Sequence, residues 1–236
     1  MKGLQLPLGV QLPDTASFET YCAGPNGEAV AALRRALHSD APPVLLLYGP
    51  SGTGKSHLLQ ALTRAGARAR ACAYLPLREL IAEGAAPGDT LDGIERAELA
   101  CLDDVDAALA RDGWPLALLR LLDALRARGG RAVVSAPAAP ERLAPPLPDL
   151  RTRLAQAAVY GLKPLSDADR TTLLHERARA RGLELPPDAA RQLLQRLPRD
   201  PGSLVAALDR LDRALLSAQR KLTPAFVQQW LKDSAD

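Results

Sequence analysis

The stretch Tyr48-Gly49-Pro50-Ser51-Gly52-Thr53-Gly54-Lys55-Ser56 decides the fold of this chain, because it matches the pattern G-x-x-x-x-G-K-[ST] at every fixed position. The apolar run 44–48 ends at its first residue and predicts a buried strand, and residues 57–62 follow it with helical spacing. A strand, a glycine-rich turn and a helix in this order form a P-loop, which surrounds a polyphosphate with backbone amides. An ordinary surface turn would need all of these features to coincide by chance.

Each residue of the loop has an expected role in holding a nucleotide. Lys55 is expected to neutralise the β- and γ-phosphates, and Ser56 to offer a hydroxyl to the magnesium ion that accompanies the nucleotide. The expected cofactors are therefore ADP or ATP, together with magnesium. The predicted nucleotide-binding residues are Gly49, Pro50, Ser51, Gly52, Thr53, Gly54, Lys55 and Ser56.

Carboxylates at the end of a later strand give a second signal for a phosphate site. Residues 98–102 predict a buried strand, and Asp103 and Asp104 follow it directly. In this Walker B arrangement, Asp103 holds magnesium through water, and Asp104 orients or deprotonates an attacking water. Ser135 ends a further predicted strand, at a position where P-loop ATPases commonly carry a residue that senses the γ-phosphate. A helix-capping or loop role for Ser135 is equally compatible with the sequence.

The order of the predicted elements indicates an α/β fold followed by helices. Strands and helices alternate as far as residue 161, which predicts a parallel sheet covered on both faces. Beyond residue 163 no further strand is indicated, and Ser166 is expected to cap the first of several helices. We therefore expect a flexible tail over residues 1–14, a P-loop NTPase base over residues 15–163 and a small all-helical lid over residues 164–236.

The composition indicates a globular protein with an almost balanced charge. Of its 236 residues, 47% are hydrophobic, and 30 basic residues against 27 acidic ones leave a net charge of +3. Because aromatic residues make up only 3% of the chain, a surface that stacks on nucleic acid is not expected. No apolar run approaches the ~20 residues of a membrane span, and the first residues lack a secretory signal. We expect a cytoplasmic protein without a membrane partner.

The first 14 residues combine apolar side chains at alternate positions with two prolines and a glycine. This composition disfavours a helix and predicts an extended tail. Such a tail either docks on a partner in extended form or packs back on its own domain. The residues alone leave both interpretations open.

Base and lid together resemble the AAA+ plan, and several local strings resemble the DnaA-related AAA+ family, most closely its Hda branch. Residues 17–21 with 24–26 are similar to the opening of the DnaA-type ATPase domain, and residues 147–154 resemble the segment that carries the arginine finger. Residues 218–224 resemble the lid of the family, and residues 5–8 resemble its motif for the β sliding clamp. The resemblance spans nearly the whole chain.

This resemblance implies a regulator that inhibits re-initiation of chromosome replication. Members of the Hda branch dock on the DNA-loaded β sliding clamp of DNA polymerase III and stimulate hydrolysis of ATP held by DnaA. DnaA and the clamp are thus the implied partners, with DNA reached only through the clamp and a homo-oligomer left open. Arg153, rather than Arg151, is implied as the arginine finger that acts in trans. The implied clamp-binding residues are Gln5, Leu6, Leu8 and Val10.

Two departures from the family pattern, and two alternative functions, bear on this interpretation. Gly202 stands where a lid arginine that touches phosphates is expected, so Arg199 is the substitute candidate, and the sensing position at Ser135 is weak. We therefore expect little or no ATPase activity within the chain itself, and the resemblance implies ADP as the working ligand.

The alternative functions are a DnaA-type initiator acting at origin DNA and a helicase-loader-type ATPase. No basic reading helix follows the lid, which disfavours the first, and the second leaves the tail motif unexplained.

Overall fold

A computed structural model describes residues 16–38 and 41–233. The predicted tail, with the clamp-binding candidates Gln5, Leu6, Leu8 and Val10, lies outside these residues. The chain divides into two compact units. The first, the base, contains the described residues up to Pro50 and residues 55–163. The second groups residues 51–54 with the region from Pro164 onward, which we call the lid.

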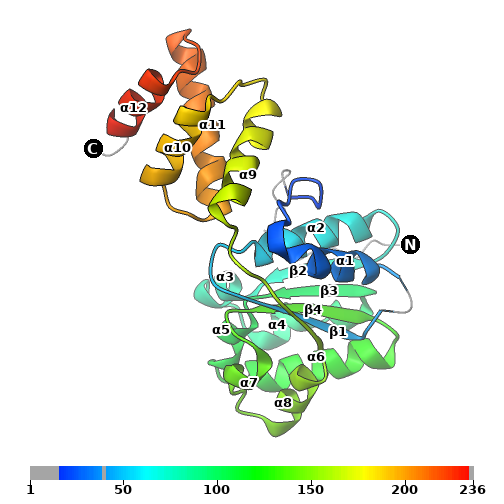
Figure 1. The fold of residues 1–236 in the computed structure, drawn as a ribbon. Coiled ribbons are helices and arrows are strands. Elements are labelled where there is room, and N and C mark those ends of the chain that lie inside the picture. The colour runs from blue at the N-terminus through cyan, green and yellow to red at the C-terminus, as the bar shows by residue number, and fades with distance from the viewer. Residues whose placement is uncertain (1–15, 39–40, 234–236) are drawn as a thin grey trace. The chain divides into compact units, whose positions relative to one another are not determined.

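A five-stranded parallel sheet forms the centre of the base, with the strand order β2-β3-β4-β1-β5 (Figure 1). The strands are short and mainly apolar because helices cover both faces of the sheet. This architecture confirms the predicted α/β fold. The strands are β1 (Val44–Tyr48), β2 (Cys72–Pro76), β3 (Leu99–Asp103), β4 (Arg131–Ala136) and β5 (Ala158–Gly161).

Helices α1 (Gly27–Arg35) and α2 (Lys55–Ala67) cover one face of the sheet, and α6 (Trp114–Ala127) covers the other (Figure 1). A short helix begins at Pro87, because proline is well suited to the first turn of a helix. The remaining elements of the base are η1 (Gly24–Asn26), α3 (Leu77–Ala82), α4 (Pro87–Leu91), η2 (Ile94–Arg96), α5 (Val105–Leu109), α7 (Pro140–Leu143) and α8 (Pro148–Ala155).

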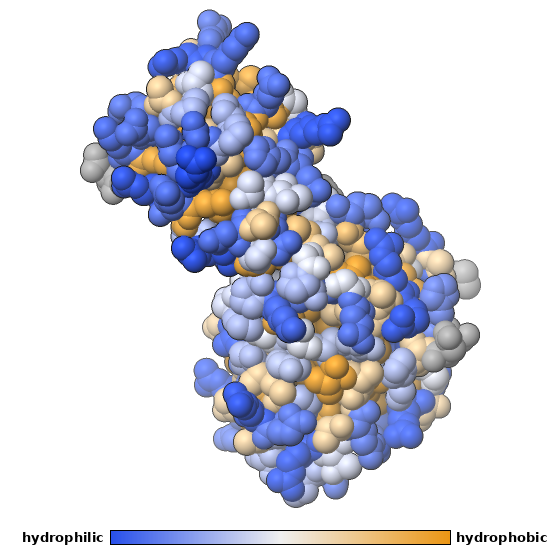
Figure 2. All heavy atoms as spheres, viewed as in Figure 1, coloured by the Kyte–Doolittle hydropathy of each residue, from blue (hydrophilic) through white to orange (hydrophobic). Residues whose placement is uncertain are grey.

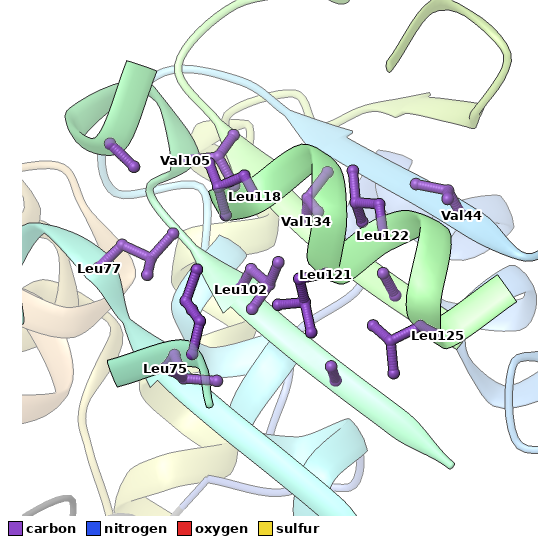
Figure 3. Close-up of a cluster of buried hydrophobic side chains, with 14 of the residues drawn as sticks. Val44, Leu75, Leu77, Leu102, Val105, Leu118, Leu121, Leu122, Leu125 and Val134 are labelled. Carbon is purple, nitrogen blue, oxygen red and sulfur yellow. The ribbon is translucent and has the colours of Figure 1, made fainter. Parts of the chain in front are cut away.

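The side chains of the strands alternate between the two faces and so divide the core of the base in two. On β1, Leu45 and Leu47 pack toward α1 and α2, whereas Leu46 packs toward α6. The α6 face of this core is drawn in Figure 3, where four leucines of α6 lie over strand residues that include Leu102 and Val134. Their spacing of three and four residues places them on one side of the helix. These leucines are Leu118, Leu121, Leu122 and Leu125.

The lid is all helical among its described residues and has its own hydrophobic core, which includes Leu193, Leu208 and Val227. Ser166 caps the first helix as predicted: its hydroxyl accepts from the amide of Asp169, and the Asp169 carboxylate accepts from the amide of Ser166. The helices are α9 (Asp167–Arg179), α10 (Pro187–Arg196), α11 (Pro201–Ala218) and α12 (Pro224–Asp233).

The face of the protein seen in Figure 2 is mostly hydrophilic, with smaller apolar areas between the polar residues. Among the described residues, three large apolar side chains are exposed: Leu116, Val159 and Leu216, at 44%, 39% and 71%. In the same part of the chain, no helix combines the length and the apolar character needed to cross a membrane.

Two leucines on α6 give a matched test of this packing. Leu118 is 2% exposed beneath the helix, whereas Leu116 is 44% exposed. Leu118→Ala is expected to lower the free energy of unfolding by about 3 kcal/mol, because it leaves a cavity between α6 and the sheet. Leu116→Ala is expected to cost less than about 1 kcal/mol. Urea unfolding followed by circular dichroism measures both values, and equal losses would contradict the packing described here.

Candidate functional site

The P-loop joins the end of β1 to the start of α2. Gly52 and Gly54 have φ angles of 77° and 87°, in the left-handed region that glycine adopts without a steric penalty. Thr53 between them is buried, whereas Ser51 is exposed. The backbone conformation at these two glycines is thus of the kind that a tight, amide-lined turn requires.

Lys55 and Ser56 form the first turn of α2, where the amides of a helix are free to bind an anion. The ammonium of Lys55 donates to the carbonyl oxygens of Gly49, at 2.7 Å, and Pro50, at 3.1 Å. Burial lowers the pKa of Lys55, and the carboxylates of Asp104 and Asp103 act in the opposite direction. The positive charge of Lys55 therefore lies in the field of the Walker B carboxylates.

The carboxylate of Asp103 is buried between hydroxyl groups from the two neighbouring strands. The hydroxyl of Tyr74 on β2 donates to Oδ2 of Asp103 at 2.8 Å, and the hydroxyl of Ser135 on β4 donates to Oδ1. Burial, followed by the nearby Asp103 charge, raises the pKa of Tyr74, so that its hydroxyl keeps its proton and remains a donor. Asp103 is 4% exposed, so these hydrogen bonds compensate for much of its lost hydration.

The strand register explains why these three side chains meet. Cys101 pairs with Tyr74 on β2 and with Val133 on β4. Asp103 and Ser135 each follow two residues later, so all of these side chains point to the face covered by α2. Gln60 of α2 extends the network by donating to the Tyr74 hydroxyl at 3.2 Å.

Asp104 lies beside this network but faces a different partner. Its φ and ψ angles are both 53°, a left-handed conformation that aspartate tolerates better than most residues. Its amide donates to the Ser135 hydroxyl at 2.8 Å, which fixes its backbone. Its Oδ2 accepts from Nε of Arg78 at 2.9 Å, and the same guanidinium donates from Nη2 to Asp106 at 2.7 Å. The predicted water-orienting carboxylate is thus held in an ion pair.

The two predicted sensor residues lie in separate units. Ser135 is fully buried, and its only proton is given to Asp103, so in this arrangement the hydroxyl has no proton to donate to a phosphate. Arg199 is exposed in the segment between α10 and α11, and its carbonyl accepts from Nε of Arg170 at 2.9 Å. Gly202 lies in the first turn of α11. A sensing role for Ser135 or Arg199 stays a prediction.

Arg153, the predicted arginine finger, lies on α8 and pairs with a residue of α6. Its Nε donates to Oδ1 of Asp123 at 2.6 Å, and the two side chains are 32% and 45% exposed. Leu150 and Leu154 are buried and attach α8 to the base, whereas Arg151 points to solvent. The structure therefore places Arg153 at the surface of the base, in an ion pair within the chain.

Tyr74 and Arg78 were not predicted as site residues, although both contact the Walker B carboxylates. Tyr74 lies in the middle of β2, and Arg78 lies in the first turn of α3, which follows β2 directly. Their contribution depends on β2 being the neighbour of β3. The available signal was the common position of both segments at the carboxyl ends of parallel strands, where polar groups of different strands meet.

The oxygen ligands of the site are too few to hold magnesium alone, but they suit a magnesium ion that is also bound by a nucleotide. Within residues 16–38 and 41–233, no group of three or more His, Cys, Asp or Glu side chains is placed to hold a metal ion. Magnesium typically takes one or two protein oxygens and completes its octahedral shell with phosphates and water. Asp103 and Ser56 supply oxygens of this kind, and Lys55 with the start of α2 supplies the positive groups that phosphates require.

A cavity of about 690 Å³ lies elsewhere on the base, between α4 and α6. Its lining includes the carboxylates of Asp89, Asp92 and Glu95, with Arg120 as the one basic side chain. A polyphosphate would be repelled by this excess of negative charge. The cavity is therefore distinct in chemistry from the P-loop site.

Comparison with known proteins gives a family match for the lid and structural similarity for most of the chain. Residues 167–231 match the family model of the lid domain of Hda. Domain III of the Thermotoga maritima replication initiation protein DnaA superposes with a TM-score of 0.79 at 22% identity, over 95% of this chain and 98% of that one.

Two further structures share the fold at lower identity. A DnaA bound to AMPPCP and single-stranded DNA gives a TM-score of 0.72 at 19% identity, covering 89% of this chain and 70% of that one. The Thermotoga maritima RuvB Holliday junction branch migration motor gives a TM-score of 0.68 at 16% identity, covering 94% and 72%. The chain therefore shares the fold of these structures, and its residues 167–231 match the lid domain of Hda.

Proposed function

We propose that this protein is a regulatory inactivator of DnaA. It binds an adenine nucleotide with magnesium, docks on the β sliding clamp through its first residues and stimulates hydrolysis of ATP held by DnaA. The observation that carries the proposal is the match of residues 167–231 to the lid of Hda, in a chain that has a complete P-loop. The result is that DnaA is returned to its ADP form and chromosome replication is not re-initiated.

Nucleotide binding is supported by the residues around β1 and β3. The P-loop glycines, Lys55 and Asp103 combine the positive and oxygen groups that a magnesium nucleotide needs. One structural relative, a DnaA, is described as bound to AMPPCP, an analogue of ATP. In this proposal ADP is the working ligand, and the protein's own turnover of ATP is slow.

The trans role of Arg153 is supported by its position and its partner. The Arg153 side chain is 32% exposed on α8, so a second protein can approach it. Its ion pair with Asp123 is partly solvated and is therefore worth no more than about 1 kcal/mol. A γ-phosphate carries more negative charge than one carboxylate and would compete well for the guanidinium. Arg153 is thus free to exchange Asp123 for ATP bound to DnaA.

The clamp contact is supported by the sequence of the first residues alone. Gln5 offers an amide for a polar anchor, and Leu6, Leu8 and Val10 offer apolar groups at alternate positions. An extended segment with this pattern places its apolar side chains on one side, as peptide grooves require. Docking would raise the concentration of the protein next to DnaA on the same DNA.

The nucleotide site is tested by Lys55→Ala. Loss of a charge-assisted contact to phosphate is expected to weaken binding of ADP and ATP by roughly 10- to 100-fold. Lys221→Ala, which removes an exposed lysine of the lid, is the matched control and should bind as the unaltered protein does. Fluorescence titration with labelled nucleotide measures both affinities. Equal affinities of the two variants would remove Lys55 from the site.

The arginine finger is tested by Arg153→Ala with Asp123→Ala as its control. Both variants lose the same ion pair, but only the first loses the guanidinium. In an assay of DnaA-bound ATP with DNA-loaded clamp, Arg153→Ala is expected to lose stimulation by on the order of 10³-fold, as in other transfers that use an arginine finger. Asp123→Ala should stimulate normally. Undiminished stimulation by Arg153→Ala would exclude the role.

The tail is tested by replacing Gln5, Leu6 and Leu8 together with alanine. Clamp binding is expected to weaken by roughly 100-fold, because apolar anchors of a short peptide carry most of its affinity. Nucleotide affinity should be unchanged. A variant with Lys2→Ala and Gln11→Ala, which alters the same tail outside the motif, should bind the clamp normally in surface plasmon resonance. If the triple variant binds the clamp as well as this control, the assignment of the tail fails.

A further inference from the structure

Another cavity lies within the lid, between α10 and α12. These two helices pack side by side (Figure 1), and the cavity between them has a volume of about 250 Å³. Each helix lines it with three residues at positions i, i+3 and i+4, the spacing that places side chains on one face of a helix. These residues are Gln192, Gln195 and Arg196 of α10, and Gln228, Leu231 and Lys232 of α12.

The two basic side chains of the cavity have no acidic partner within the described part of the lid. Each of the two helices has one acidic residue, and both are engaged elsewhere. Asp188 forms an ion pair at 3.0 Å with another arginine of its own helix, and Asp233 accepts from Nε2 of Gln229 at 2.7 Å. Among the described residues no ion pair involves Arg196 or Lys232, and both are exposed. The cavity therefore carries positive charge that a ligand can neutralise.

The same cavity contains a polar atom without a partner. Gln192 is half-buried, and its Oε1 is buried and accepts no hydrogen bond from any described residue. Burial of an acceptor in this way is unfavourable, so the oxygen requires a donor that the described chain does not supply. Because the last torsion of a glutamine side chain is broad, this oxygen can turn toward an N–H group placed in the cavity.

The basic residues alone have a structural explanation, but it is incomplete. Arg196 and Lys232 lie in the last turns of their helices, where a positive charge stabilises the helix dipole. This accounts for the two charges and leaves the unsatisfied oxygen of Gln192 unexplained. The same helix ends carry partial negative charge. They therefore favour a ligand that has N–H donors beside its anionic group over a bare polyanion.

We propose that this cavity is a docking site for an acidic peptide segment of a partner protein. A carboxylate of the segment accepts from the guanidinium of Arg196 and the ammonium of Lys232, while a neighbouring backbone N–H donates to Oε1 of Gln192. Leu231 offers an apolar contact to an adjacent aliphatic side chain. None of these residues is assigned to the nucleotide, to the clamp or to the arginine finger.

The size and the charge of the cavity limit what it can hold. At ~30 Å³ for each water molecule, it has room for roughly eight waters, which suits an acidic side chain with its adjoining backbone. The guanidinium of Arg196 can bind both oxygens of a carboxylate, so it should contribute more than the ammonium of Lys232. Since both groups are exposed, binding should weaken as the salt concentration rises.

The experiment measures the fluorescence anisotropy of a labelled, amidated Asp-Glu-Leu-Asp-Glu peptide titrated with the full chain. We expect saturable binding, and about tenfold weaker binding of the uncharged peptide Asn-Gln-Leu-Asn-Gln. Arg196→Ala combined with Lys232→Ala should weaken binding of the acidic peptide by about 30-fold. The matched control is Arg179→Ala combined with Lys221→Ala, which removes the same charge from exposed residues of the lid that do not line the cavity. It should bind as the unaltered chain does.

Gln192→Met separates a ligand contact from a structural one. The change removes the acceptor and keeps the length of the side chain, so affinity for the acidic peptide should fall by about fivefold. In urea unfolding of the free chain, this variant should be as stable as the unaltered chain or more stable, because an unsatisfied buried oxygen is lost. Lower stability with unchanged peptide affinity would show that the oxygen serves the lid itself, which contradicts the proposal.

The remaining outcomes also decide the proposal. It is wrong if the unaltered chain does not bind the acidic peptide, or if the cavity variant and its charge-matched control bind the peptide equally. It is also wrong if inorganic phosphate displaces the labelled peptide as effectively as the same concentration of unlabelled peptide. Loss of binding in the cavity variant alone supports it. No nucleotide is present in these measurements, so their result is independent of the proposed function.

Discussion

The carboxylate of Asp103, held between the hydroxyls of Tyr74 and Ser135, is the interaction on which the candidate site depends. The three residues come from three adjacent strands, so the hydrogen bonds form only in the observed register of β2, β3 and β4. Because β4 lies between β3 and β1, the same register brings the Walker B carboxylates to the edge of the sheet where the P-loop begins. A slip by one residue would turn Asp103 to the opposite face.

Local signals made the architecture and the P-loop predictable from the sequence. The glycines, Lys55 and the flanking apolar runs are contiguous, and Ser166 lies three residues before Asp169, so each pattern could be recognised without knowing the fold. The partners of Asp104 could not be recognised in this way, because Arg78 precedes it by 26 residues and reaches it only through the pairing of β2 with β3. Short helices such as α4 and α5 cannot be recognised from the sequence in this way, because a single turn carries little periodicity.

Two arginines on the base illustrate how one kind of ion pair can have different consequences. Arg78 holds the carboxylate of Asp104, whose charge acts on Lys55. Arg153 is paired with Asp123 of α6 in a partly exposed ion pair, so a second protein can approach it. The proposal thus assigns nucleotide holding to the chain's own site and rate enhancement to its surface. The Hda lid match and the AAA+ fold are consistent with this division.

The central claim is that the base holds an adenine nucleotide through the P-loop and a magnesium ion next to Asp103. The most direct measurement is calorimetric titration of the full, unaltered chain with ADP and with ATP, each in magnesium and in EDTA. We predict saturable binding of both nucleotides at one site per chain, with affinity that falls when magnesium is removed. Absence of binding to either nucleotide in the presence of magnesium would contradict the claim.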